Sequence, residues 1–334
     1  RTIVKHGLSK IAHTNRPGLQ ALFKQAGLEK EDFTPYEVGY IIAPRLNAAG
    51  RIDSAMDSLR LLCTNDPKRA KDLAEKLELI NKERQLVLKE ATLHAIATVN
   101  NSQLTVNNLL FVAHESYQQG VIGLVAGKLV EEFYRPSIVL SIGETHTKAS
   151  ARSVNGFNLI EFLRLHTDFF VNVGGHPMAA GFTVETTKLD SLKLALEKSA
   201  LKILTDEILT RSLKIDCEIS LSIISQTLYN DIQALAPFGM GNPEPTFVSK
   251  GVKVKDFKLL GKDRTHLKLT LYQETGTENQ EPKTLEAIGF GLSEFALNLK
   301  PGDKIDIVYT IDENVWNGNT KLQLKLKDIK SNDK

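Results

Sequence analysis

The sequence predicts a chain with an α/β part and an all-β part, joined to a helical region by one long connecting helix. A helical pattern without Gly or Pro runs from residue 68 to residue 99. Strand and helix patterns then alternate between residues 109 and 204, and short strands with a period of two follow from about residue 213. The expected parts are residues 1–65, 66–101, 102–208 and 209–334.

The first two parts are expected to be helical. Helical patterns lie around residues 18–26 and 35–43, and Asp66 and Pro67 suit the cap and the first position of the next helix. Apolar residues then recur at helical spacing, at Ala70, Leu73, Ala74, Leu77 and Ile80. A helix of roughly 33 residues would be about 50 Å long, which is typical of helices that connect domains.

The α/β part is expected to begin with a βαβ unit and a parallel sheet, from a strand at residues 109–113, a helix at 121–133 and a strand at 137–142. The alternation continues with a strand at residues 149–153, a helix at 158–165, a strand at 179–184 and a helix at 188–204. Gly174 and Gly175 are interpreted as a tight turn whose peptide N–H groups can face an anion, with His176 placed to donate a hydrogen bond. An ordinary turn with a surface histidine is the alternative.

The all-β part is expected to form a small barrel. Strand patterns lie at residues 214–219, 252–260, 266–272, 284–290, 304–311 and 322–329. Residues 266–271 and 321–327 alternate apolar and polar side chains, and Asn317-Gly318 is typical of a hairpin turn. Short strands in this number favour an OB-like fold, which binds oligonucleotides.

Composition limits the function classes. The 42 basic residues nearly balance the 40 acidic ones, so a nucleic acid would have to bind a local basic surface. Cys63 and Cys217 are too few for a disulfide framework or a zinc site, and we expect both to be buried thiols. The longest apolar runs are too short to cross a bilayer, which predicts a cytoplasmic protein without membrane contact. The chain opens on Arg1 rather than Met, and we expect it to be a fragment.

Four stretches carry a family resemblance. The string GGHPMAAGF at residues 174–182 is similar to the signature of the DHHA1 domain. Residues 44–51, 150–158 and 237–245 resemble RecJ-like exonucleases of the DHH phosphoesterase superfamily, in the family's order and over nearly the whole chain. The resemblance implies a DHHA1 domain and an OB-like nucleic-acid-binding domain. It also implies a single-stranded-DNA-specific 5′→3′ exonuclease of DNA repair and recombination.

The string PRLNAAGR at residues 44–51 offers phosphate ligands. The resemblance implies that it faces the cleft beside the DHHA1 domain, and guanidinium groups suit phosphate because they are planar and always charged. We therefore expect Asn47 and Arg51 to hold phosphates, and favour Arg51 over Arg45. The alternative is that one arginine pairs with Asp53 or Asp57.

Ser150 and Arg152 lie two apart on a predicted strand, so both side chains point into the same space. The resemblance implies that they hold the 5′-terminal phosphate, that Gly174 and Gly175 approach the DNA closely, and that His176 is catalytic and stabilises charge on the scissile phosphate. An exposed strand with ordinary polar residues is the alternative for the Ser–Arg pair.

The glycines at residues 120–128 do not form a P-loop, because three residues rather than four precede the Gly-Lys pair and Leu129 follows it. Gly123 and Gly127 are four apart on a predicted helix, so we expect both to allow close packing against the sheet.

The predicted barrel carries its own basic residues. Lys321, Lys325 and Lys327 share the polar face of one strand, Lys268 lies on another, and Trp316 is at a hairpin tip. Basic side chains beside an aromatic ring hold single strands in OB-like folds. A solvated strand face and a ring that plugs the barrel are the alternative.

No Asp-His-His triplet occurs in the chain. The resemblance therefore implies that the ligands of Mn²⁺ or Mg²⁺ lie upstream, that this chain alone binds no metal, and that it is inactive by itself. The expected partners are single-stranded DNA with a 5′ end, a single-strand-binding protein and a helicase, with the chain monomeric. A DHH phosphodiesterase for short or cyclic nucleotides and a non-catalytic DNA-binding scaffold are the alternatives.

Overall fold

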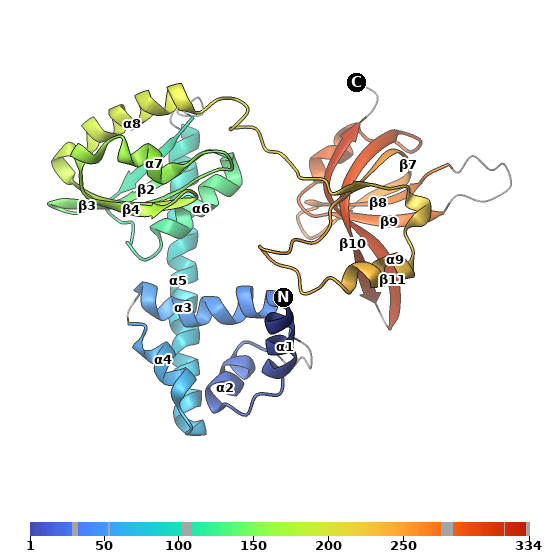
Figure 1. The fold of residues 1–334 in the computed structure, drawn as a ribbon, viewed down its shortest axis with the longest axis horizontal. Coiled ribbons are helices and arrows are strands. Elements are labelled where there is room, and N and C mark those ends of the chain that lie inside the picture. The colour runs from blue at the N-terminus through green and yellow to red at the C-terminus, as the bar shows by residue number, and fades with distance from the viewer. Residues whose placement is uncertain (29–32, 53, 102–107, 275–282, 317, 332–334) are drawn as a thin grey trace. The chain divides into compact units, whose positions relative to one another are not determined.

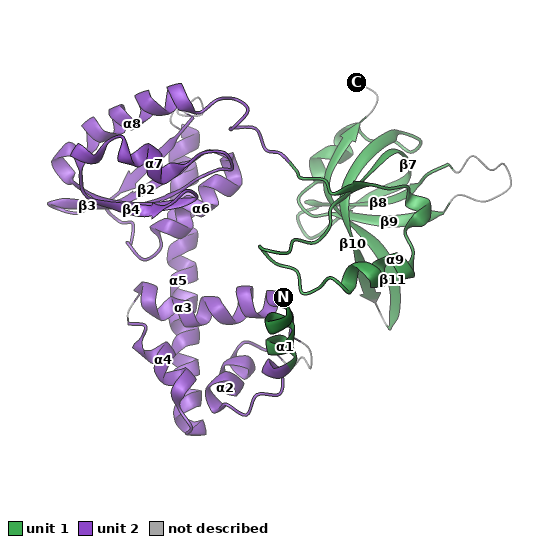
Figure 2. Cartoon of the chain, in the orientation of Figure 1, with its two compact units in different colours: residues 1–9, 213–334 green, residues 10–212 purple. Residues whose placement is uncertain are grey.

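The computed structural model describes the whole chain except residues 29–32, 53, 102–107, 275–282, 317 and 332–334 (Figure 1). The chain divides into two compact units (Figure 2). One unit is Lys10–Ser212, and the other combines Arg1–Ser9 with Leu213–Lys334. Every residue expected to bind a phosphate or the 5′ end lies in Lys10–Ser212.

The helical region is built on the connecting helix α5, which confirms the long helix expected from the sequence. Its helices are α1 (Thr2–Ile11), α2 (Pro17–Gln25), a π-helix (Glu37–Ile42), α3 (Ala43–Ile52), α4 (Met56–Cys63) and α5 (Pro67–Asn101). Asp66 accepts a hydrogen bond from the backbone N–H of Lys68 at 2.9 Å, and Pro67 is the first residue of α5. Helices α2, α3 and α4 pack on α5, so this helix positions α3 and its phosphate-ligand candidates.

The α/β domain has one five-stranded sheet in the order β1-β2-β3-β5-β4. Its elements are β1 (Leu110–His114), α6 (Ile122–Phe133), β2 (Ser137–Ser141), β3 (His146–Arg152), α7 (Leu159–Arg164), β4 (Phe170–His176), β5 (Ala179–Glu185) and α8 (Leu189–Ile203). Helices α7 and α8 contribute to the core on one face, and α5 and α6 pack with β1 in a second core.

The expected parallel sheet is wrong beyond the first βαβ unit. Strands β1 and β2 are parallel, but β3, β4 and β5 all pair antiparallel. Short connections join β2 to β3 and β4 to β5, and a chain that reverses in so few residues produces antiparallel neighbours. The alternation pattern of the sequence does not reveal these reversals.

The expected tight turn at Gly174 and Gly175 is also wrong. Both glycines and His176 end strand β4, where His176 pairs with Ala179 of β5. Gly175 has a φ of +151°, and a Cβ there would lie 2.4 Å from the carbonyl oxygen of Ala179. Glycine is therefore required by the close approach of two strands and not by a loop that surrounds an anion.

The C-terminal domain is a closed five-stranded barrel, as expected. Its elements are β6 (Cys217–Glu218), α9 (Gln226–Gln233), β7 (Phe247–Leu260), β8 (His266–Tyr272), β9 (Thr284–Gly289), β10 (Lys304–Trp316) and β11 (Asn319–Ser331). Strands follow the order β10-β11-β9-β8-β7, and β10 also pairs with β7 to close the barrel. The first expected strand has only two residues, because β6 makes just two pairs with β7.

The expectation of two buried thiols is wrong. Cys63 and Cys217 are both exposed and free. Cys63 is the last residue of α4 and Cys217 lies on the short strand β6, so neither position is covered by a second layer of structure.

Candidate phosphate-binding site

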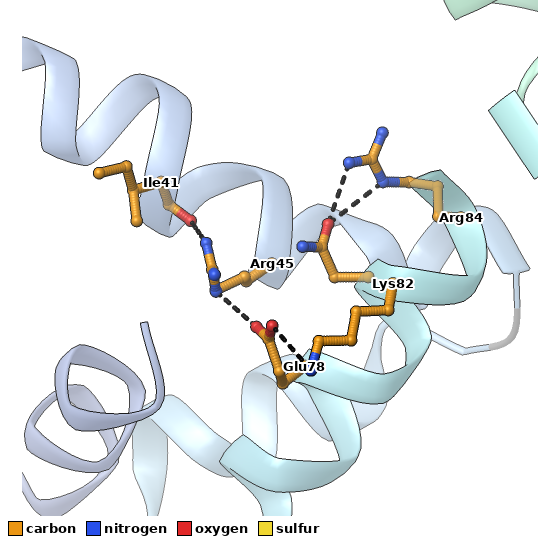
Figure 3. Close-up of polar contacts among 6 residues, drawn as sticks. Ile41, Arg45, Glu78, Lys82 and Arg84 are labelled. Carbon is orange, nitrogen blue, oxygen red and sulfur yellow. Dashed lines mark hydrogen bonds and ion pairs between the residues drawn. The ribbon is translucent and has the colours of Figure 1, made fainter. Parts of the chain in front are cut away.

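Arg45 holds α3 against α5. Its Nε donates to Oε2 of Glu78 at 2.7 Å, its Nη1 donates to the carbonyl oxygen of Ile41 at 2.8 Å, and Lys82 lies 3.8 Å from the same carboxylate (Figure 3). Glu78 is buried. A charge in this position is stabilised by its partners, so Arg45 has a structural role.

We expect Glu78→Ala to lower the free energy of unfolding by about 3 kcal/mol, because it leaves Arg45 partly buried without its counter-ion. The control is Glu75→Ala on the same helix, whose exposed carboxylate lies 3.8 Å from Lys71 and contributes about 0–1 kcal/mol. Chemical denaturation followed by circular dichroism measures both. Equal losses in the two variants would contradict the structural role of Arg45.

Asp57 does not pair with either arginine of the motif. Its carboxylate binds Lys76 at 2.6 Å and Arg60 at 2.8 Å. The hydrogen bond from Lys76, followed by that from Arg60, lowers the pKa of Asp57. Asp53, the other alternative partner, lies outside the described residues.

Arg51 contacts the loop before α6. Its Nη1 donates to the carbonyl oxygen of Gly120 at 3.2 Å, and a Cβ added to Gly120 would lie only 1.9 Å from the carbonyl oxygen of Arg51. Asn47 is exposed one turn earlier on α3, on the same face as Arg51. The end of α3 is therefore fitted against the start of α6 by direct backbone contact.

Ser150 and Arg152 point to the same place, as expected from their spacing. The Nη1 of Arg152 lies 3.3 Å from the Oγ of Ser150. A Cβ on Gly123 would lie 2.8 Å from Ser150 Oγ and 3.0 Å from Arg152 Nη2, which confirms the close packing expected at Gly123. Gly127 has nothing within 4 Å of an added Cβ, so the same expectation is wrong there.

The N-terminus of α6 adds the positive end of a helix dipole to the site of Ser150 and Arg152. Its N-cap residue is Val121, and no side chain caps the first N–H groups. The N–H groups of Ile122 and Gly123, which open this twelve-residue helix, point out of its N-terminus and favour an anion. The loop that fails as a P-loop in sequence thus places a helix N-terminus beside Ser150 and Arg152.

Arg84 of α5 is a third arginine in this region, and the sequence analysis missed it. It is buried, and its Nε and Nη2 donate to Oδ1 of Asn81 at 3.3 and 3.0 Å (Figure 3). Burial, and then repulsion from Arg51, lower the pKa of both Arg84 and Arg152. Arg84 follows Lys82-Glu83, a run typical of a solvated helix face, so the sequence offers no signal for it.

Within the part of the chain that the structure describes, Arg51, Arg84 and Arg152 have no acidic partner. Guanidinium groups in proteins stay charged at neutral pH even when burial and repulsion lower their pKa. Arg84 is buried, Arg152 is partly buried and Arg51 is exposed. Because buried charges are normally paired, Arg84 and Arg152 call for an external anion. With Ser150 and the start of α6 beside them, the chemistry suits a phosphate group.

His176 shares a face of the sheet with Arg152. Arg152 pairs with Ala179 of β5, and Ala179 pairs with His176 of β4. Two strand spacings place the backbones of Arg152 and His176 about 10 Å apart. Gly174 pairs with Gly181, which pairs with Ser150, so Gly174 borders the same face, and His176 is exposed there. Gly175 is in register with Ala180 and Ala151 instead.

A second basic place lies on the barrel. A groove of about 470 Å³ is lined by Lys258, Lys268, Glu286, Asn314, Asn319 and Lys321. Lys268 forms an ion pair with Glu286 at 2.8 Å and lies directly opposite Lys258. Lys325 is exposed and lies 5.9 Å above the ring of Phe290. The side chain of Trp316 lies outside the described residues.

In the described ranges, no three His, Cys, Asp or Glu side chains come together as a metal site would need. None of the described helices is both long and apolar enough to span a bilayer.

The fold and the site define an α/β domain of the DHHA1 type followed by a barrel of the OB type. The place where Arg51, Ser150 and Arg152 meet the start of α6 is called the cationic pocket below. Residues 101–202 match the family model of the DHHA1 domain, and residues 215–328 match that of the RecJ OB domain. The chain is similar to the C-terminal portion of RecJ proteins.

Relatives support this placement. The single-stranded-DNA-specific exonuclease RecJ of Bacillus subtilis is 36% identical over 98% of this chain, and that of Haemophilus influenzae is 29% identical over 100%. The chain covers only 41% and 58% of these two proteins. The structure of RecJ from Thermus thermophilus in complex with Mg²⁺ superposes with a TM-score of 0.82 at 25% identity, over 99% of this chain and 49% of that one.

Proposed function

We propose that this chain is the DNA-gripping part of a single-stranded-DNA-specific 5′→3′ exonuclease that acts in DNA repair and recombination. The observation that carries the proposal is the gathering of Arg51 and Arg152 with Ser150 around the uncapped start of α6, without an acidic partner in the described residues. The B. subtilis and H. influenzae relatives bear the name of such an exonuclease.

The pocket binds the 5′-terminal phosphate. Arg152 and Ser150 donate to its oxygens from β3, and Arg51 donates from α3. The first N–H groups of α6 add donors from a third direction. Groups that converge from three elements hold a phosphate in one orientation, which favours entry of the strand by its end.

His176 and Asn47 act next to the pocket that binds the terminal phosphate. His176 lies on the same sheet face as Arg152 but two strands away, so it donates to a phosphate further along the strand. In the proposed enzyme this is the scissile phosphate, on which His176 stabilises developing charge. Asn47, one turn from Arg51 and exposed, holds a phosphate at the rim, and Gly174 and Gly175 let the strand approach the sheet edge.

The ligands of Mn²⁺ or Mg²⁺ lie in the part of the enzyme outside this chain. The Thermus thermophilus RecJ structures hold one or the other of these metals. In the same proposal the enzyme is a cytoplasmic monomer that meets its strand through a single-strand-binding protein and a helicase.

The barrel holds the strand beyond the end. Lys258, Lys268 and Lys321 line one groove, and Lys325 beside Phe290 offers a cation and a ring for a base. The Lys268–Glu286 pair leaves Lys258 and Lys321 as the stronger phosphate contacts. A barrel of this kind suits a polymer rather than a cyclic dinucleotide.

We expect the double variant Lys258→Ala, Lys321→Ala to weaken binding of all single strands, whatever their 5′ end, and to reduce the slope of log affinity against log salt by about 1.4. Lys300→Ala with Lys330→Ala, two exposed lysines that do not line the groove, is the matched control. Anisotropy titrations at several salt concentrations measure the slopes. The same slope in both double variants would place the strand elsewhere.

Anisotropy with oligonucleotides of about 12 nucleotides tests the proposed function. The wild-type chain should bind a 5′-phosphorylated single strand more tightly than the 5′-hydroxyl strand, and both more tightly than blunt duplex. Equal affinity for the two single strands would overturn the proposal that the pocket recognises the terminal phosphate. Tighter binding of a cyclic dinucleotide than of the phosphorylated strand would favour the short-nucleotide phosphodiesterase.

A further inference from the structure

Arg84 lies where the connecting helix reaches the pocket. One turn after Arg84, Leu88 begins the stretch of α5 that packs with β1 and α6, and α3 packs on α5 as well. Arg84 shares a face of α5 with Leu88 and Ala91. Leu88 packs on, and Ala91 belongs to, the core that includes Ile122, the first residue of α6. Figure 3 shows its guanidinium turned away from Glu78, which is occupied by Arg45.

In the part of the chain that the structure describes, the hydrogen bonds of Arg84 leave some of its N–H groups without a partner. A guanidinium has five N–H groups, and Arg84 uses two of them on Oδ1 of Asn81. Asn81 is only 1% exposed and Arg84 only 9% exposed, so Asn81 fixes the orientation of a nearly buried guanidinium group. The oriented fork is preorganised for an anion, and binding would cost little side-chain entropy.

Charge repulsion supports the same placement. Burial lowers the pKa of both Arg84 and Arg152, and repulsion from Arg51 lowers each of them further. Arg51 repels each of the other two guanidinium groups, and this repulsion costs stability because none of the three has an acidic partner in the described residues. An anion with two negative charges offsets more of this repulsion than an anion with one.

We propose that Arg84 is the specificity-determining third cation of the pocket, and that it selects a terminal phosphate monoester, with two negative charges, over a phosphodiester with one. The proposal rests on the proposed function, since it assigns a ligand to the same pocket. A terminal phosphate carries a charge of about −1.5 to −2 at pH 7, whereas each internal phosphate carries one. Arg84 thereby distinguishes the end of a strand from its interior.

The test compares two strands whose 5′ ends differ in charge and by one methyl group, a 5′-phosphate and its methyl ester, with the 5′-hydroxyl strand as reference. We expect the wild-type chain to prefer the monoester over the methyl ester by on the order of tenfold. Arg84→Gln, which keeps a donor for Asn81, should reduce this preference to about twofold by weakening monoester binding. Thermal melting of each variant verifies that it is folded.

The matched control is Arg69→Gln, which removes one positive charge from α5 about 22 Å away from Arg84 along the helix. Its preference for the monoester should equal that of the wild type. An unchanged preference in Arg84→Gln, or an equal loss for all three strands, would overturn the role of Arg84. Recognition of the terminal phosphate by the rest of the pocket would not be contradicted. A wild type that does not distinguish phosphate from hydroxyl ends would overturn the proposed function itself.

Discussion

Arg152→Ala should weaken binding of a 5′-phosphorylated single strand by on the order of 30-fold to 100-fold, the largest effect that we expect from one side chain in the pocket. The variant removes the guanidinium that lies beside both Ser150 and the start of α6. It also removes a partly buried charge that has no acidic partner in the described residues, so the fold should lose little stability. Anisotropy gives the affinity and thermal melting gives the stability.

The 5′-hydroxyl strand and a matched arginine are the controls. Binding of the hydroxyl strand should change by less than about threefold in Arg152→Ala, because the barrel still holds the strand. Arg164→Ala removes an exposed arginine of the same domain, which pairs with Glu161 at 2.7 Å, and should bind both strands like the wild type. Equal losses for the two strands in Arg152→Ala would show that Arg152 does not recognise the terminal phosphate.

Gly120→Ala should both destabilise the Lys10–Ser212 unit and reduce the preference for a 5′-phosphate, by about 2 kcal/mol and about tenfold. The new Cβ would lie 1.9 Å from the carbonyl oxygen of Arg51, and a backbone atom cannot move aside as the end of a side chain can. Relief of the clash separates α3 from the start of α6, and Arg51 leaves the pocket with α3. Chemical denaturation and anisotropy measure the two effects.

Gly127→Ala on the helix that follows is the matched control. Nothing lies within 4 Å of its added Cβ, and alanine is favoured over glycine inside a helix by roughly 0.5–1 kcal/mol. This variant should therefore be more stable than the wild type and bind the phosphorylated strand equally well. A Gly120→Ala variant that behaves like Gly127→Ala would mean that the contact between Arg51 and Gly120 does not position the pocket.

The sequence by itself determined which segments of the chain form helices and which form strands. The helical pattern after Pro67 predicted α5 nearly to its ends, because periodic apolar spacing and a capped start are local properties. The period-two strands predicted the barrel for the same reason. The family strings predicted the RecJ relationship. Arg45 and Arg51 carry the same chemistry in the sequence, and they differ only in that Glu78, far along the chain, pairs with Arg45.

The tertiary structure alone decided what surrounds each residue. Strand direction in the sheet depends on how the chain returns, which spacing does not encode, so the parallel sheet and the glycine turn were wrong. Arg84 stands in an ordinary charged run and becomes buried only where α3 and α6 approach α5. Local pattern fixes secondary structure because backbone preferences act between near neighbours. Burial of the arginines and repulsion between them arise from contacts between distant segments, and these contacts exist only in the folded chain.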